Sequence, residues 1–310
     1  MRGRPDLRAR GPAGRAASAA PWACPPRRRG GDGAAWEASW ERPPAGLPPA
    51  GGGDAFRHLP TVAVARLLLL LLALPASASA QPWGVTASTA VESVGDRGTW
   101  LESRLAVGGR AGGLAGLAEA GVVERYGQAA AFVGADLYPT LADGAYANVR
   151  ARWAPGSDVT ARLDLAAEAF VALGGGWEGS AGARRLAFAD RAVVAASASG
   201  ARYAGPWYVR GQVSAVPDGG RVPVSARLLV RRLDGDEGGA FGSFWEVSVG
   251  RGEEAVVEAA GQSAVRGSWS VAGRLQRPLA GPVGLSLGAG YTADGDLSRA
   301  AAEAGLSVRW

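Results

Sequence analysis

The amino-acid sequence predicts an all-β protein: a transmembrane antiparallel β-barrel of about fourteen strands (twelve to sixteen), preceded by a cleaved signal peptide. Three observations lead to this prediction. A short apolar segment before residue 81 has the pattern of a secretory leader. Apolar and polar residues alternate with period two from residue 83 onward, and the alternating segments are about ten residues long, enough to cross a bilayer at a tilt.

The leader occupies residues 62–80. Arg66 supplies a positive flank, a run of leucines forms a short apolar core, and Ala78 and Ala80 form a small-x-small cleavage site before Gln81. The alternative is a membrane-spanning helix, but such a helix needs about 20 apolar residues, more than this segment offers. We therefore expect a secretory signal peptide.

Residues 1–61 are rich in Pro, Gly and Arg and cannot form a hydrophobic core. A signal peptide ordinarily begins a chain, so two hypotheses remain for this stretch: a disordered extension, or a start site assigned too far upstream. Detection of a peptide from residues 1–55 by mass spectrometry would rule out the second. The predicted organisation is an extension (1–61), a signal peptide (62–80) and a barrel (81–310).

Strands follow one another from residue 83, separated by Gly-, Asp- and Pro-rich turns such as GDRG at 95–98 and PGSD at 155–158. In the segment 145–153, for example, Ala and Val alternate with Tyr, Asn and Arg. We expect strands near residues 83–92, 99–107, 113–124, 128–138, 144–153, 159–170, 177–188, 191–200, 207–216, 221–233, 240–250, 262–275, 283–292 and 301–310.

The same alternation would suit a soluble β-sandwich, which remains the alternative. Three features favour the barrel: the strand length, the small apolar faces of Ala, Gly, Val and Leu, and the tryptophans near strand ends. Barrels place aromatic residues at the two membrane interfaces, and the tryptophans at expected strand ends are Trp83, Trp100, Trp153, Trp177, Trp207 and Trp310. Because every backbone polar group needs a partner in hydrocarbon, a spanning sheet must close on itself.

The polar faces of the strands carry paired charges that we expect to face the lumen. Candidate lumen residues are Arg150, Arg152, Arg162, Asp164, Glu168, Arg210, Arg227, Arg231, Tyr146 and Tyr208. One interpretation is a ladder of ion pairs that holds neighbouring strands in register. The other is a selectivity surface for an anionic or sugar solute, because guanidinium groups bind carboxylates and tyrosines stack on rings.

The last segment alternates apolar and polar residues and ends on an aromatic residue. Leu306, Val308 and Trp310 have the pattern of the C-terminal signal recognised by outer-membrane assembly machinery. The alternative is a surface strand that happens to end in Trp. With the barrel period, the pattern favours assembly of a monomeric barrel into the lipid bilayer of the outer membrane.

Charge and chemistry exclude several functions. Residues 81–310 hold 22 Arg against 23 Asp and Glu, so they lack the basic surface of a nucleic-acid-binding protein. They contain no His and no Cys, which excludes a Ser-His triad, a Cys nucleophile and a His metal site, so we expect no enzyme, no cofactor and no metal. A carboxylate-based hydrolase is a remote alternative, because Asp164 and Glu168 lie about 13 Å apart along one strand.

Several segments, in order, resemble the YaiO family of outer-membrane β-barrels. They are ERYGQ (124–128), GADLYPTLADGAYANVRARWAP (134–155), EAF (168–170), GGWEGSAGARRLAF (175–188), ARYAGPWYVRGQVSAVPDGG (201–220), ARLLVRRLDGDEG (226–238) and the terminal strand. Gly-Pro-Trp at 205–207 departs from the family, which tends to have Gly-Asn-Tyr-Trp. The resemblance implies a barrel in the cell outer membrane of a Gram-negative envelope but no settled activity. Two functions fit the sequence: a porin-like pore or export conduit for a sugar or anionic solute, and a plugged structural or interaction barrel without transport.

Overall fold

The computed structural model describes residues 83–95, 98–111, 113–217, 220–234, 243–257, 263–294 and 297–309. The predicted extension, the signal peptide with Ala78 and Ala80, and the terminal Trp310 lie outside the described residues. Within the described ranges, no helix is long and apolar enough to cross a membrane.

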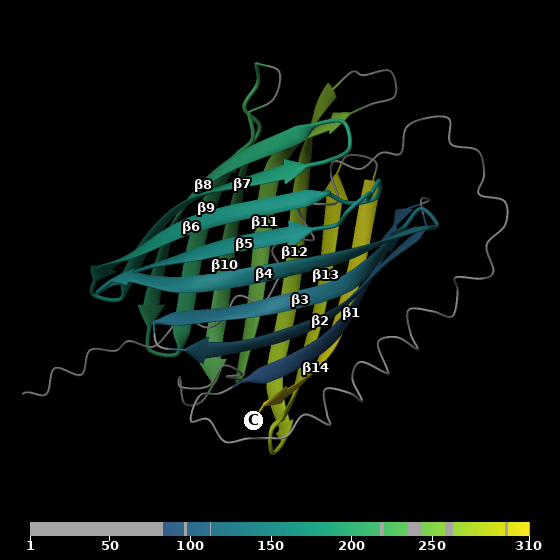
Figure 1. Cartoon of the computed structure of the whole chain (residues 1–310). Coiled ribbons are helices and arrows are strands. Elements are labelled where there is room, and N and C mark those ends of the chain that lie inside the picture. Colours follow the sequence, from purple (N-terminus) through teal and green to yellow (C-terminus); the bar gives the residue numbers. More distant parts are fainter. Residues whose placement is uncertain are drawn as a thin grey trace, which may run out of the picture.

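Fourteen antiparallel strands form one closed barrel in which each strand pairs with its neighbours in sequence (Figure 1). The predicted fold class is therefore confirmed, including the two strands with the weakest alternation, β3 and β8. The strands are β1 Gly84–Val94, β2 Thr99–Ala111, β3 Leu114–Arg125, β4 Gln128–Ala142, β5 Ala145–Trp153, β6 Leu163–Gly174, β7 Trp177–Ala187, β8 Ala192–Ala204, β9 Trp207–Ala215, β10 Val224–Asp234, β11 Ser243–Val257, β12 Ser263–Ala280, β13 Val283–Asp294 and β14 Leu297–Arg309.

The seam between β1 and β14 closes the barrel. Pairing runs without a register shift from Gly84 with Arg309 to Val94 with Arg299. Closure leaves no strand edge, so the backbone N–H and C=O groups of the first and last strands find partners within the sheet. The chain therefore satisfies the hydrogen-bonding condition for a sheet immersed in hydrocarbon.

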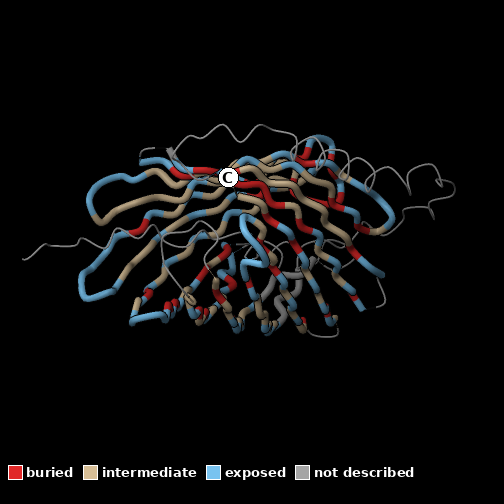
Figure 2. Tube along the Cα trace, turned by 90° about the horizontal axis from the view of Figure 1, so that it is seen from below, coloured by how far each residue is buried: buried red, intermediate tan, exposed pale blue. Residues whose placement is uncertain are grey.

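Burial alternates along the strands, as the tube in Figure 2 shows for many of them. On β5 and β6, Val149 and Leu165 point outward and are 43% and 40% exposed, whereas the adjacent Arg150 and Asp164 point into the barrel. Since strand side chains alternate between the two faces, the apolar rows form the lipid-facing surface and the charged rows line the lumen.

The two ends of the barrel differ in the length of their connections. At the end where β1 begins, five connections between strands are two residues long, and only the one between β10 and β11 is longer. At the opposite end, the connections after β5 and β9 span residues 154–162 and 216–223. Barrels of the outer membrane have short periplasmic turns and longer external loops, so we call the first the inner end and the second the outer end.

The predicted strand at 159–170 was wrong at its start, because β6 begins at Leu163. Residues 154–162 form an irregular segment in which the Ser157 hydroxyl accepts hydrogen bonds from the backbone N–H groups of Val159 and Thr160. The Arg125 side chain donates to the Val159 carbonyl at 3.2 Å. These local bonds hold the backbone away from the ladder, as serine side chains commonly do.

Two tryptophans lie differently from the prediction. Trp100 was expected in an interfacial girdle, but it is 3% exposed and packs against Tyr126 at 5.3 Å inside the barrel. Trp245 was not among the tryptophans expected at strand ends, but it is the third residue of β11 and lies at the inner end. Trp100 lies on the same face of β2 as the lumen residues Glu102 and Arg104, whereas the depth of Trp245 differs because β11 begins later than expected.

Candidate functional site in the barrel lumen

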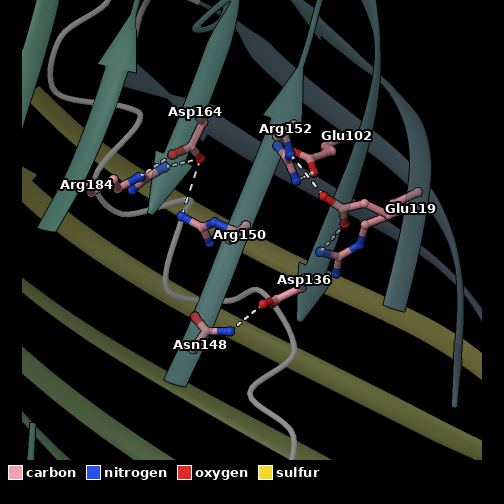
Figure 3. Close-up of polar contacts among 9 residues, drawn as sticks. Glu102, Glu119, Asp136, Asn148, Arg150, Arg152, Asp164 and Arg184 are labelled. Atoms are coloured by element: carbon pink, nitrogen blue, oxygen red, sulfur yellow. Dashed lines mark hydrogen bonds and ion pairs between the residues drawn. The ribbon is translucent and has the colours of Figure 1, made fainter. Parts of the chain in front are cut away.

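A chain of alternating charges crosses the lumen wall. Arg152 on β5 contacts Glu102 on β2 and Glu119 on β3, each at 3.2 Å. Arg104 on β2 contacts Glu119 and also Glu303 on β14, each at 3.6 Å. Except for Arg104–Glu119, these ion pairs connect strands that are not hydrogen-bonded to each other, including strands on either side of the β1–β14 seam (Figure 3 shows the β2–β5 part).

Three further ion pairs extend this network in both directions. Arg274 on β12 reaches Glu303 at 3.7 Å. On the other side, Arg150 lies on the same face of β5 as Arg152 and contacts Asp164 on β6 at 3.3 Å. Asp164 also accepts two hydrogen bonds from Arg184 on β7, each 2.8 Å long (Figure 3). The network therefore runs around most of the lumen, from β12 through β14, β2, β3 and β5 to β7.

A layer of buried aromatic and charged side chains lies at the inner end, on β5 to β11. Tyr146 stacks on Phe170 with ring centroids 4.5 Å apart and donates to Glu178 at 3.1 Å. Tyr208 is 5% exposed and lies 4.6 Å from Tyr203. We call the set Tyr146, Phe170, Tyr203, Tyr208, Arg210 and Phe244 the inner layer.

Arg210 is the charged centre of the inner layer. Its side chain is 2% exposed and bonds Glu168, three strands away, at 2.5 Å. Glu168 also accepts from the Ser180 hydroxyl, which lies against Ser199. Two other donor atoms of Arg210, Nε and Nη1, have no hydrogen-bond partner among the described residues. Inside the lumen this guanidinium is held by a single carboxylate and its neighbouring hydroxyl.

Two further candidate lumen arginines lie on β10. Arg231 pairs with Glu246 on β11 through both Nε and Nη2, and it lies over the Phe244 ring. Arg227 donates to the Ser248 hydroxyl at 2.9 Å. On this side of the lumen, one arginine is therefore paired with a carboxylate and the other with a hydroxyl group.

The structure brings nine of the ten candidate lumen residues to the barrel interior and excludes Arg162. Arg162 lies in the connection before β6, where its side chain is 42% exposed and pairs with Asp158 at 2.8 Å. The candidates also omitted Glu102, Arg104, Glu119 and Glu303, which are central to the network. The sequence places each of these four residues on the polar face of an alternating segment. The period-two pattern alone, however, does not distinguish them from other polar residues on the same faces.

A cavity of about 270 Å³ lies within the lumen and is lined from both sides. The β1–β6 wall contributes charged residues such as Arg104 and Arg152, and the β10–β14 wall contributes both charged residues such as Arg274 and small ones such as Ser270 and Gly290. The lining includes seven arginines and six carboxylates, so its charges are nearly balanced. No member of the inner layer lines the cavity, so the cavity lies on the outer side of that layer.

Nothing in the described residues assembles a catalytic centre around the candidate carboxylates. Asp164 is engaged by Arg150 and Arg184, and Glu168 by Arg210 and Ser180, which places each carboxylate in its own ion-pair cluster. Among the residues that the structure describes, no three His, Cys, Asp or Glu side chains are grouped to hold a metal ion.

The sequence profile of the YaiO membrane beta barrel domain matches residues 85–255. No curated protein is significantly similar to the chain. One similar solved structure is the CymD monoaromatic hydrocarbon channel, with 8% sequence identity and a TM-score of 0.48; the match covers 74% of this chain and 87% of that one. Another is Salmonella typhi OmpF in complex with daunomycin, with 8% identity and a TM-score of 0.45; the match covers 74% of this chain and 97% of that one. An anion-selective porin from Comamonas acidovorans is also similar, with 9% identity and a TM-score of 0.41; the match covers 74% of this chain and 98% of that one. Likenesses this distant carry no information about the solute or partner of this chain.

Proposed function

Because this chain belongs to the YaiO family of membrane β-barrels and is located in the outer membrane, we propose that it is a channel for a polar solute, with the lumen cavity as its selective section. The observation that carries the proposal is the cavity itself, which is lined by charged and hydroxyl groups from both sides of the barrel. A purely structural barrel has no need of such a polar interior space.

The charge balance of the cavity favours an uncharged, hydroxyl-rich solute such as a sugar over a small inorganic anion. Lumen arginines such as Arg104 and Arg152 are each within 4 Å of two carboxylates, so little net positive charge remains to attract an anion. A sugar, in contrast, can exchange hydrogen bonds with guanidinium, carboxylate and serine groups together. We therefore expect weak discrimination between small cations and anions.

The proposal is tested by planar-bilayer conductance and by uptake of sugars into proteoliposomes. Gly290 lines the cavity, and a Cβ there would meet Ala272 at an ordinary 3.5 Å, so Gly290→Trp should fold and project into the lumen. We expect this variant to lower conductance and sugar uptake by about half or more. Leu287→Trp on the same strand is the matched control and should conduct like the wild type, because Leu287 faces lipid, is 44% exposed and does not line the cavity.

A second candidate is a barrel plugged at the inner layer, and one observation favours it. Phe170, Tyr208 and Arg210 are each at most 5% exposed, so side chains fill this part of the lumen. If the layer is a permanent plug, folded wild-type protein will not conduct, whereas Tyr208→Ala will open a path. That pair of results would overturn the channel proposal in favour of a structural or interaction barrel.

A further inference from the structure

The lipid-facing surface carries an alternating row of tryptophan and arginine at the inner end. The row crosses six consecutive strands, from β7 to β12, with one residue on each. Its members, which we call the Trp–Arg row, are Trp177, Arg202, Trp207, Arg232, Trp245 and Arg277.

Each member points away from the lumen, because its neighbour in the strand points inward. Glu178, Tyr203 and Tyr208, next to Trp177, Arg202 and Trp207, make lumen contacts. The exposures agree, since Trp177 is 50% exposed and the Arg232 and Arg277 side chains are 49% and 47% exposed. The row therefore faces lipid rather than the cavity.

Contacts along the row hold the guanidinium groups at one depth. Arg202 lies over the Trp177 ring at 5.1 Å, and Arg232 lies over the Trp207 ring at 5.9 Å. Trp207 and Trp245 meet edge to face at 5.5 Å. Cation–π contacts and edge-to-face packing both restrict the side chains, so the cations are positioned before any ligand arrives.

One carboxylate bridges the last two arginines. Asp234 contacts Arg232 at 3.3 Å and Arg277 at 2.8 Å. The row with Asp234 thus carries three positive charges and one negative charge, a net charge of about two. The Arg232 and Arg277 side chains remain 49% and 47% exposed, so they can contact a further anion.

Among the residues that the structure describes, the outward-facing arginines at the inner end lie in one sector of the barrel. At the inner end of the other strands, the outward-facing side chains include large apolar residues such as Leu114, Leu141 and Leu173, which are 44%, 60% and 67% exposed. A general interfacial girdle would distribute tryptophan and arginine around the whole circumference. Exposed Trp83 lies at the same end beside β1, but the arginines are concentrated on β7–β12, which indicates a local site.

We propose that the Trp–Arg row binds the phosphate-bearing headgroup of an anionic phospholipid in the periplasmic leaflet. The inner end lies at that leaflet, long arginine side chains reach from the strand to the interface, and guanidinium groups match phosphate oxygens with two parallel hydrogen bonds. The tryptophan rings pack against the upper part of the acyl chains, with their N–H groups toward the headgroup region. This site is independent of whether the lumen conducts.

The test measures lipid retention by the folded barrel. Wild-type protein is reconstituted in nanodiscs of phosphatidylcholine and phosphatidylglycerol, extracted, and examined by native mass spectrometry for bound lipid. We expect phosphatidylglycerol to be enriched over phosphatidylcholine, and the enrichment to fall about fivefold for each of Arg202→Gln, Arg232→Gln and Arg277→Gln. Arg185→Gln, an outward-facing arginine toward the outer end of β7, is the matched control and should leave retention unchanged.

A second measurement locates the lipid. Brominated phosphatidylglycerol should quench tryptophan fluorescence more than brominated phosphatidylcholine, and the excess should disappear in the triple Arg→Gln variant. Heat-dependent migration on gels checks that each variant is folded. Equal lipid retention by the folded triple variant and the wild type would overturn the proposal, as would an equal loss in the outer-end control. A wild-type dimer that the triple variant converts to monomer, with lipid retention unchanged, would assign the row to contact between copies instead.

Discussion

Asp164 offers a sharp test of the lumen network, because replacing it by Asn removes one negative charge while keeping its shape. The Asp164 side chain is 4% exposed, and it accepts two 2.8 Å hydrogen bonds from Arg184 and contacts Arg150 at 3.3 Å. In the Asp164→Asn variant, the guanidinium groups of Arg184 and Arg150 lose the carboxylate that they share, at a position with little access to water. Removing one partner of a buried ion pair costs about 3–5 kcal/mol.

The lower part of that range applies here. The Arg184 and Arg150 side chains retain 16% and 24% exposure, so cavity water can solvate them in part. We expect Asp164→Asn to lower the free energy of unfolding by about 3 kcal/mol. The double variant Arg184→Met with Asp164→Asn should lose less free energy of unfolding than the two single variants lose together, because each single change leaves one charged partner unpaired.

The assay is reversible urea unfolding of the refolded barrel in lipid vesicles, followed by tryptophan fluorescence. Asp158→Asn is the matched control, because it also removes one carboxylate facing an arginine, in a pair whose side chains are 68% and 42% exposed. An exposed pair contributes about 0–1 kcal/mol, so this variant should be close to wild type. If Asp164→Asn proves no more destabilising than Asp158→Asn, the network is not holding the strands together.

Two further predictions test packing and membrane depth. Gly121→Ala should lower the free energy of unfolding by about 1–3 kcal/mol, because a Cβ there would lie 2.4 Å from the Ser103 carbonyl oxygen and 2.5 Å from the Phe132 ring. A Cβ at Gly200 meets nothing within 4 Å, so Gly200→Ala should be neutral in the same unfolding assay. Val149 lies in the middle of the lipid-facing side of β5, so Val149→Arg should lower the free energy of unfolding by about 2–4 kcal/mol. Ala145 lies at the inner end of the same face, so Ala145→Arg should lower it by about 1 kcal/mol or less. Equal costs at the two depths would contradict the assignment of this face to lipid.

Much of the barrel follows from properties of the chain that are local. Alternation with period two specifies which face each side chain occupies, because an extended chain turns by half a rotation per residue. Arg150 and Arg152 could therefore be assigned to the lumen from the sequence, and turn residues such as Gly144, with φ of 77°, marked where strands end. The need to pair every backbone group in lipid then predicted closure without any information on long-range contacts.

Local turn chemistry accounts for the errors in those assignments. Arg162 was assigned to the lumen because the alternation continues back to Val159, yet the Ser157 hydroxyl captures two backbone N–H groups and delays the strand until Leu163. A hydroxyl that bonds its own backbone leaves the apolar pattern unchanged, so period two could not reveal it.

Which charged residues pair with each other is decided by the tertiary structure. Arg152 meets Glu119 two strands away, and Arg210 meets Glu168 three strands away. The Trp–Arg row likewise exists only because six strands align their inner ends. Such contacts depend on the register between neighbours and on the stagger that closure imposes on all fourteen strands together. Period two repeats every second residue and is the same in any register, so the side a residue faces could be derived from the sequence, whereas its partner across the lumen could not.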